Sequence, residues 1–169
     1  MSLLKAPIGP NAPHEVNTII EIPRGSTNKY EYDPATNLFR LDRVLYSPLF
    51  YPFDYGFIPS THYIDGDPLD VLVMIYHPTF PGCHVEARPI GVMEMSDEKG
   101  PDEKILCVAS NDPRFGYRKH YTDISHHTIK EITHFFQVYK DLEHKEVEVV
   151  GWHGPELAYE LIQKYRTDL

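Results

Sequence analysis

The sequence has little cysteine and no long apolar run. Its 169 residues include two cysteines, Cys83 and Cys107, which are too few for a disulfide framework and match no metal-ligand spacing. No stretch approaches the ~18 apolar residues that a membrane span requires, and the first fifteen residues lack the apolar segment of a signal peptide. We therefore expect reduced cysteines, no membrane partner and a cytoplasmic location.

The sequence is also poor in positive charge. Lysine and arginine number 16 against 25 aspartates and glutamates, which gives a formal net charge of −9. An acidic surface repels nucleic acid and anionic membranes, so neither is expected as the main partner, and an anionic substrate would need a local cationic site. No Walker A motif, internal repeat or interdomain linker is present. Residues 1–169 are therefore expected to form a single domain around one hydrophobic core.

The most distinctive stretch runs from Asp65 to Asp70, where three aspartates lie just before an apolar strand. Gly66 tolerates unusual backbone angles and Pro68 fixes its own φ, so this loop is expected to be stiff. Two like charges about 4 Å apart repel by about 4 kcal/mol at an effective dielectric near 20. Converging carboxylates therefore need protons or a cation, and a hard divalent metal takes oxygen ligands.

Two simpler interpretations of this loop compete with a metal site. A calcium-binding EF-hand requires an oxygen ligand at loop position 5, Gly at position 6 and Glu at position 12. Counted from Asp65, these positions hold Leu69, Asp70 and Tyr76, and a strand pattern follows, which argues strongly against an EF-hand. The other alternative is a solvated acidic turn before a buried strand, and only the placement of other charged residues can decide against it.

The remaining chain shows the patterns of short strands followed by two late helices. Strands are expected at residues 16–22, 29–32, 38–43, 71–76, 84–95, 105–108 and 147–150, with helices at 123–139 and from Pro155 onward. Thr128 to Glu131 is predicted to be the capping box of the first helix, and the aromatic-rich segment 50–57 is predicted to be irregular. This order favours an α+β fold, a closed or strongly twisted barrel with helices packed outside it.

Many segments of the chain resemble the soluble family I inorganic pyrophosphatases. The sequence from Asp65 to Val71 is similar to the family's signature segment. Further matching segments occur in the family's order along nearly the whole chain, at residues 20–23, 29–31, 42–43, 51–52, 55–56, 97–98, 102–104, 134–136 and 139–141. The resemblance implies a compact five-stranded OB-like β-barrel with two flanking α-helices, a homohexameric assembly, and Mg²⁺-dependent hydrolysis of inorganic pyrophosphate to two orthophosphates.

The resemblance also implies roles for individual residues. Asp67 resembles the general base beside the attacking water. The expected metal ligands are Asp65, Asp70, Asp97, Asp102 and Glu31. The expected phosphate ligands are Lys29, Arg43, Tyr55, Lys104, Tyr139 and Lys140. Glu21 and Tyr51 are expected to support these residues from a second layer.

The residue types fit this chemistry, and two rival functions remain open. Pyrophosphate carries about three to four negative charges, so a nucleophile can approach only after cations spread that charge. As a first rival, a barrel with 12 tyrosines and 8 phenylalanines could stack single-stranded nucleic acid, although the net charge opposes it. As a second, the substrate could be another phosphoanhydride, such as a nucleotide or a polyphosphate, although no base-binding segment stands out.

Overall fold

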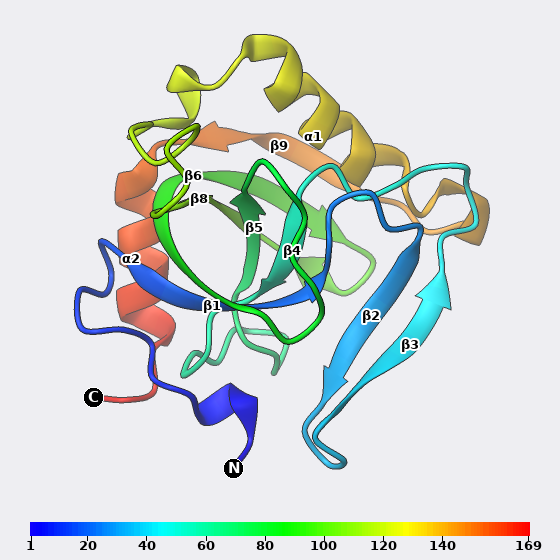
Figure 1. The fold of residues 1–169 in the computed structure, drawn as a ribbon. Coiled ribbons are helices and arrows are strands. Elements are labelled where there is room, and N and C mark those ends of the chain that lie inside the picture. Colours follow the sequence, from blue (N-terminus) through cyan, green and yellow to red (C-terminus); the bar gives the residue numbers. More distant parts are fainter.

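The computed structural model describes residues 1–169 as a closed β-barrel with helices on its outside (Figure 1). The barrel strands are β1 (Val16–Ile22), β4 (Asp54–Phe57), β5 (Asp70–Met74), β6 (His84–Asp97) and β8 (Lys104–Ala109). They are hydrogen-bonded in the order β1–β4–β5–β8–β6, and β6 pairs back onto β1. β5 and β8 are parallel, and the other pairs are antiparallel. The expected α+β fold with a five-stranded barrel is confirmed.

The other elements surround this barrel. A separate two-stranded hairpin consists of β2 (Asn28–Asp33) and β3 (Leu38–Val44), and it stands beside the barrel in Figure 1. Two short strands pair with β6, namely β7 (Gly100–Pro101) and β9 (Glu148–His153). The helices are α1 (His126–Val138) and α2 (Pro155–Tyr165), with 3-10 turns at Leu3–Lys5, Tyr121–Asp123 and Asp141–Glu143. Neither helix has the length and apolar character needed to cross a membrane.

Two clusters of buried apolar side chains hold the barrel and its helices together. Strand side chains alternate, so Leu72 and Met74 of β5 join the cluster beneath α1, whereas Val71 and Val73 join the cluster beneath α2. Asp70, the first residue of β5, lies on the same face of the strand as Leu72 and Met74. The charged residues of the loop from Asp65 to Asp70, called the central loop below, therefore lie where the core beneath α1 reaches the surface.

The prediction that residues 50–57 are irregular is wrong for their second half. Asp54–Phe57 forms strand β4, and all four of its residues are buried. Gly56 reads as a strand breaker in the sequence, but the close pairing of β4 with β1 requires it. A Cβ atom at this position would lie 1.9 Å from the carbonyl oxygen of Ile19. Here tertiary packing overrides the local preference.

The predicted capping box of α1 is also wrong. The helix begins at His126 after Ser125, so Thr128 lies within its first turn rather than before it. A capping box does occur just upstream, on the preceding 3-10 turn, where the side chains of His120 and Asp123 bond reciprocally to backbone N–H groups. A short polar motif therefore located the region of the helix start but not its first residue.

Candidate active site

Charged side chains from the barrel, the hairpin and the end of α1 line one cavity of about 240 Å³. It is lined by every residue with a proposed role as base, metal ligand or phosphate ligand, and also by Glu21. Of the proposed set only Tyr51 lies outside the lining. Its side chain is buried behind the cavity, with its ring centroid 5.4 Å from that of Tyr55. The acidic loop is therefore part of a charged cavity rather than an isolated solvated turn.

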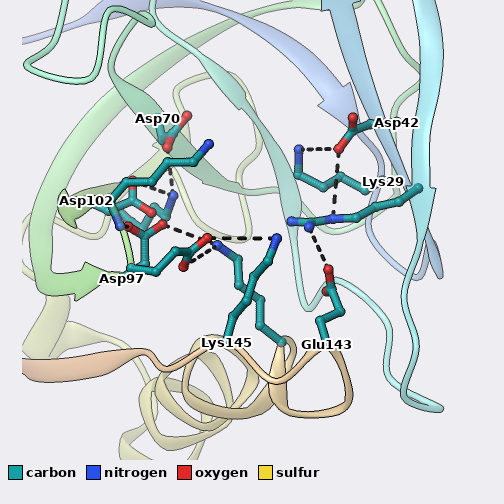
Figure 2. Close-up of polar contacts among 12 residues, drawn as sticks. Lys29, Asp42, Asp70, Asp97, Asp102, Glu143 and Lys145 are labelled. Carbon is teal, nitrogen blue, oxygen red and sulfur yellow. Dashed lines mark hydrogen bonds and ion pairs between the residues drawn. The ribbon is translucent and has the colours of Figure 1, made fainter.

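Lys104 lies at the centre of the acidic side of this cavity. Its Nζ donates to Asp70 Oδ2 at 2.7 Å and to Asp102 Oδ1 at 2.9 Å (Figure 2). It also donates to the Tyr55 hydroxyl at 2.8 Å. The side chain is 5% exposed. Burial alone would lower the pKa of the Lys104 ammonium, but the Asp70 and Asp102 carboxylates outweigh this and raise it. Lys104 therefore stays charged at neutral pH.

The second wall of the cavity carries a similar pair. Lys140, just beyond α1, places its Nζ 3.2 Å from Asp97 Oδ2 and 3.7 Å from Glu98. Asp97 Oδ1 also accepts a hydrogen bond from Lys99 N at 2.8 Å. Partial burial would raise the pKa of Asp97, but this hydrogen bond and the Lys140 charge lower it instead. Asp97 is thus an ionised carboxylate near neutral pH, and its oxygens can bind a metal ion.

The hairpin brings two more cations to the opposite side. Lys29 Nζ lies 3.3 Å from Asp42 Oδ2, and Arg43 Nη1 donates to Glu143 Oε1 at 2.6 Å (Figure 2). No role of Asp42 or Glu143 was predicted from the sequence. Asp42 adjoins Arg43 in a segment that matches the family, which is a usable signal. Glu143 carries no comparable signal, because its partner is 100 residues away in the chain.

The central loop has the tight backbone that its composition predicts. Gly66 adopts a φ of +91°, and its N–H donates to the Tyr63 carbonyl at 3.0 Å. Asp67 N donates to Asp65 Oδ1 at 3.0 Å. Desolvation on the cavity side, followed by the charges of Asp65 and Glu31, raises the pKa of Asp67. A carboxylate with a raised pKa is a stronger base than an ordinary aspartate.

Glu21 lies between the barrel and the hairpin. It belongs to β1, and its Oε1 accepts a hydrogen bond from Tyr32 N on β2 at 2.9 Å. Burial raises the pKa of Glu21 to about 8, and the nearby Asp70 charge adds to this effect. The structure shows a half-buried carboxyl that connects β1 with β2.

The donor set of the cavity fits a hard divalent cation. Its potential ligands are the carboxylates of Asp65, Asp67, Asp70, Asp97, Asp102 and Glu31. No three His, Cys, Asp or Glu side chains form a ready-made cluster around one point. Mg²⁺ is commonly bound by one or two carboxylates together with waters and substrate phosphates, so dispersed oxygen donors suit it. Calcium sites, by contrast, use six to eight oxygens.

The fold and the cavity together define a class of protein. A small OB-like barrel with carboxylates, ammonium groups and tyrosine hydroxyls around one cavity is suited to an enzyme that binds a small polyanion together with cations. Stacking of nucleic-acid bases needs exposed rings. The tyrosines that line this cavity, Tyr32, Tyr55 and Tyr139, are each at most 7% exposed.

Comparison with known proteins identifies the family. A model of the inorganic pyrophosphatase family matches residues 18–169. The inorganic pyrophosphatase of a Synechocystis species is 51% identical over 164 residues, which cover 97% of this chain and 96% of the relative. That of Methanosarcina mazei is 51% identical over 146 residues, 86% of each chain. The crystal structure of inorganic pyrophosphatase from Thermus thermophilus superposes with a TM-score of 0.94 at 46% identity, covering 96% of this chain and 95% of that one.

The chain belongs to the inorganic pyrophosphatase family. This membership confirms the resemblance seen in the sequence and the expected enzyme class, an inorganic diphosphatase. The family model covers residues 18–169, so it includes every residue that lines the cavity except Leu4.

Proposed function

We propose that this chain hydrolyses inorganic pyrophosphate to two orthophosphates in the cavity described above, with Mg²⁺ as its cofactor. The observation that carries the proposal is the meeting of seven carboxyl groups and five cationic side chains around one cavity of about 240 Å³. That volume suits a small polyanion, and 12 of the 20 residues that line the cavity are charged.

The phosphate oxygens would bind to cations that are already oriented. Lys29, Arg43, Lys104 and Lys140 each contact at least one carboxylate, which holds their flexible side chains in place before substrate arrives. Substrate oxygens would then share or replace those partners. Burial raises the pKa of the Tyr55 and Tyr139 hydroxyls, so both remain protonated and can donate to phosphate.

The carboxylates of the cavity would bind the metal, and one of them, in the central loop, would accept a proton. Asp65, Asp70, Asp97, Asp102 and Glu31 are the proposed metal ligands. Bound Mg²⁺ neutralises phosphate oxygens and lowers the pKa of water. Asp67 would take the proton of the attacking water, a role that suits a carboxylate with a raised pKa. The Lys104 ammonium would stabilise the charge on the departing phosphate.

A phosphate-release assay tests this function. Purified protein with Mg²⁺ and pyrophosphate should release orthophosphate, and excess EDTA should stop the release because the carboxylates act through the cation. ATP and tripolyphosphate, assayed under the same conditions, separate pyrophosphate hydrolysis from a broader phosphoanhydride activity. Undiminished turnover in EDTA, or faster release from ATP than from pyrophosphate, would contradict the proposal.

We also propose a homohexamer, as the resemblance implies, and a location in the cytoplasm, as the low cysteine content suggests. Tyr76 and Phe80 are more than half exposed, and association would remove such side chains from water. Light scattering at neutral pH should then report six times the 19.6 kDa of one chain. A monomer would contradict the assembly. Recovery of the protein in the soluble cytoplasmic fraction of its cells checks the location.

A further inference from the structure

The β2–β3 hairpin carries three proposed site residues, yet it shares no strand ladder with the barrel. Lys29 and Glu31 lie on β2 and Arg43 lies on β3, and all three line the cavity. An isolated two-stranded hairpin is marginally stable in water. The placement of these residues therefore depends on the contacts that tie the hairpin to the rest of the chain.

Tyr32 supplies an unusual number of these contacts. It directly follows Glu31, is 4% exposed, and lies with its ring centroid 6.1 Å from that of Phe57 on barrel strand β4. Its N–H donates to Glu21 on β1 at 2.9 Å, and its hydroxyl donates to Asn37 Oδ1 in the hairpin turn at 2.6 Å. A single residue thus connects the hairpin with two strands of the barrel.

The N-terminal arm, residues 2–6, completes this arrangement. The Tyr32 hydroxyl accepts a hydrogen bond from Leu3 N at 3.0 Å, and Leu4 lines the cavity itself. Leu3 and Leu4 also pack on the small buried cluster that contains Tyr32. The arm is fixed to the barrel side by Ser60, whose N–H donates to the Leu4 carbonyl at 2.7 Å and whose hydroxyl donates to the Ala6 carbonyl at 2.8 Å.

We propose that Tyr32 and the N-terminal arm act as a latch that positions the hairpin, and with it Lys29, Glu31 and Arg43, for substrate binding. Tyr32 is thus a positioning residue, acting through its neighbours rather than on the substrate. The functional part of this proposal rests on the proposed pyrophosphatase activity. The mechanical part, that the hydroxyl holds the hairpin, stands independently of it.

Tyr32→Phe tests the latch by removing the hydroxyl and keeping the ring. We expect KM for Mg-pyrophosphate to rise roughly two- to tenfold, the range expected from one neutral hydrogen bond. The kcat at saturating substrate should change by less than about twofold, because the barrel residues stay in place. Tyr30→Phe is the matched control. Its hydroxyl accepts only a local bond from Asn28 at 3.2 Å, so its KM should not change.

The arm can be tested from its own side with two variants of Leu3. Leu3→Pro removes the N–H that donates to Tyr32, whereas Leu3→Ala keeps the N–H and also loses the leucine packing. Proline is acceptable at this first helical position, and Ser2 already has the extended ψ of 136° that suits a residue before proline. The KM of Leu3→Pro should exceed that of Leu3→Ala. The combined effect of Tyr32→Phe and Leu3→Pro should be less than the sum of their separate effects, because both remove the bond between Leu3 N and the Tyr32 hydroxyl.

Hydrogen exchange gives a readout that does not require activity. In Tyr32→Phe, amides of residues 28–44 should exchange faster than in the parent protein, while those of β5 and β8 should not change. A raised KM without faster exchange, faster exchange without a raised KM, or additive effects of the two substitutions would each overturn the latch. If the parent protein releases no phosphate and Tyr32→Phe still exchanges faster than the parent, the proposed function is rejected and the mechanical part stands.

Discussion

The two sides of the cavity are held in place by different kinds of interaction. On the barrel side, Asp70 and Lys104 begin the neighbouring parallel strands β5 and β8, whose ladder sets their separation. On the hairpin side, Lys29 pairs with Arg43 across β2 and β3, but no ladder joins that sheet to the barrel. Backbone pairing thus fixes one side, and side-chain contacts fix the other. We expect substitutions on the barrel side to affect kcat or stability, and those on the hairpin side to affect KM.

The largest expected effect on the barrel side comes from Asp67→Asn. Asparagine keeps the shape of the side chain but cannot accept the proton of the attacking water, a loss of roughly 10²- to 10⁴-fold in kcat. KM should change little. Raising the pH should recover part of the rate, because hydroxide can replace the water that Asp67 assists. A pH profile of kcat checks this, and an unchanged kcat at neutral pH would assign the base elsewhere.

Lys104→Met should destabilise the same side. It leaves Asp70 and Asp102 without their buried cation, and removing one partner of a buried ion pair costs roughly 3–5 kcal/mol of unfolding free energy. Urea denaturation in the presence of a chelator measures the loss. Lys99→Met is the control, since Lys99 is exposed and makes no ion pair. Equal stability of the two variants would show that Lys104 is not structurally important.

Glu21→Gln probes the contact between the two sides. The pKa of Glu21 is about 8 in the folded protein against an ordinary 4.5. Between these pH values the folded protein holds one proton more than the unfolded chain, so this group lowers stability as pH rises through that window. Glutamine can keep the bond from Tyr32 N without that penalty.

Glu21→Gln should therefore gain stability over the parent as pH increases from about 5 to 8, by a few kcal/mol in total. Above pH 8 the difference should level off. Denaturant titrations of both proteins in chelator, at several pH values, give the comparison. A difference that is constant with pH would mean that Glu21 ionises normally.

Arg43→Lys should produce the smallest effect, and this effect should be on substrate binding rather than on kcat. Lysine keeps the charge but loses the planar donor group that reaches Glu143 at 2.6 Å. We expect KM to rise by about tenfold or less, with kcat within about twofold. Steady-state kinetics decide this. A fall in kcat with unchanged KM would break the division between the two sides.

Local sequence patterns predicted much of the fold. The strand predicted at residues 16–22 is β1 with the same bounds, and the strands predicted at 29–32 and 38–43 are the two strands of the hairpin. Strand β4 was not predicted, because Gly56 and Pro52 are residues typical of loops. Its pairing with β1 is a tertiary contact that no short window contains.

The candidate site was predicted from a family resemblance, whereas its supporting contacts were not predictable. Tyr32 and Leu3 are 29 residues apart, and Arg43 and Glu143 are 100 apart. Such pairs carry no sequence motif, because they form only after the barrel has closed. The sequence therefore indicated which residues gather at the cavity, and the structure was needed to show what holds them.

The most direct test of this account is a Mg²⁺ titration of kcat for Asp67→Asn beside Asp70→Asn. The two residues belong to one short loop but have different proposed roles. Asp70 is a proposed metal ligand, and Asp67 is the proposed base. Higher Mg²⁺ should restore part of the rate of Asp70→Asn by compensating for weaker binding, and should leave Asp67→Asn at its low plateau. Recovery of the Asp67 variant at saturating Mg²⁺ would contradict the account, because that residue would then be a ligand.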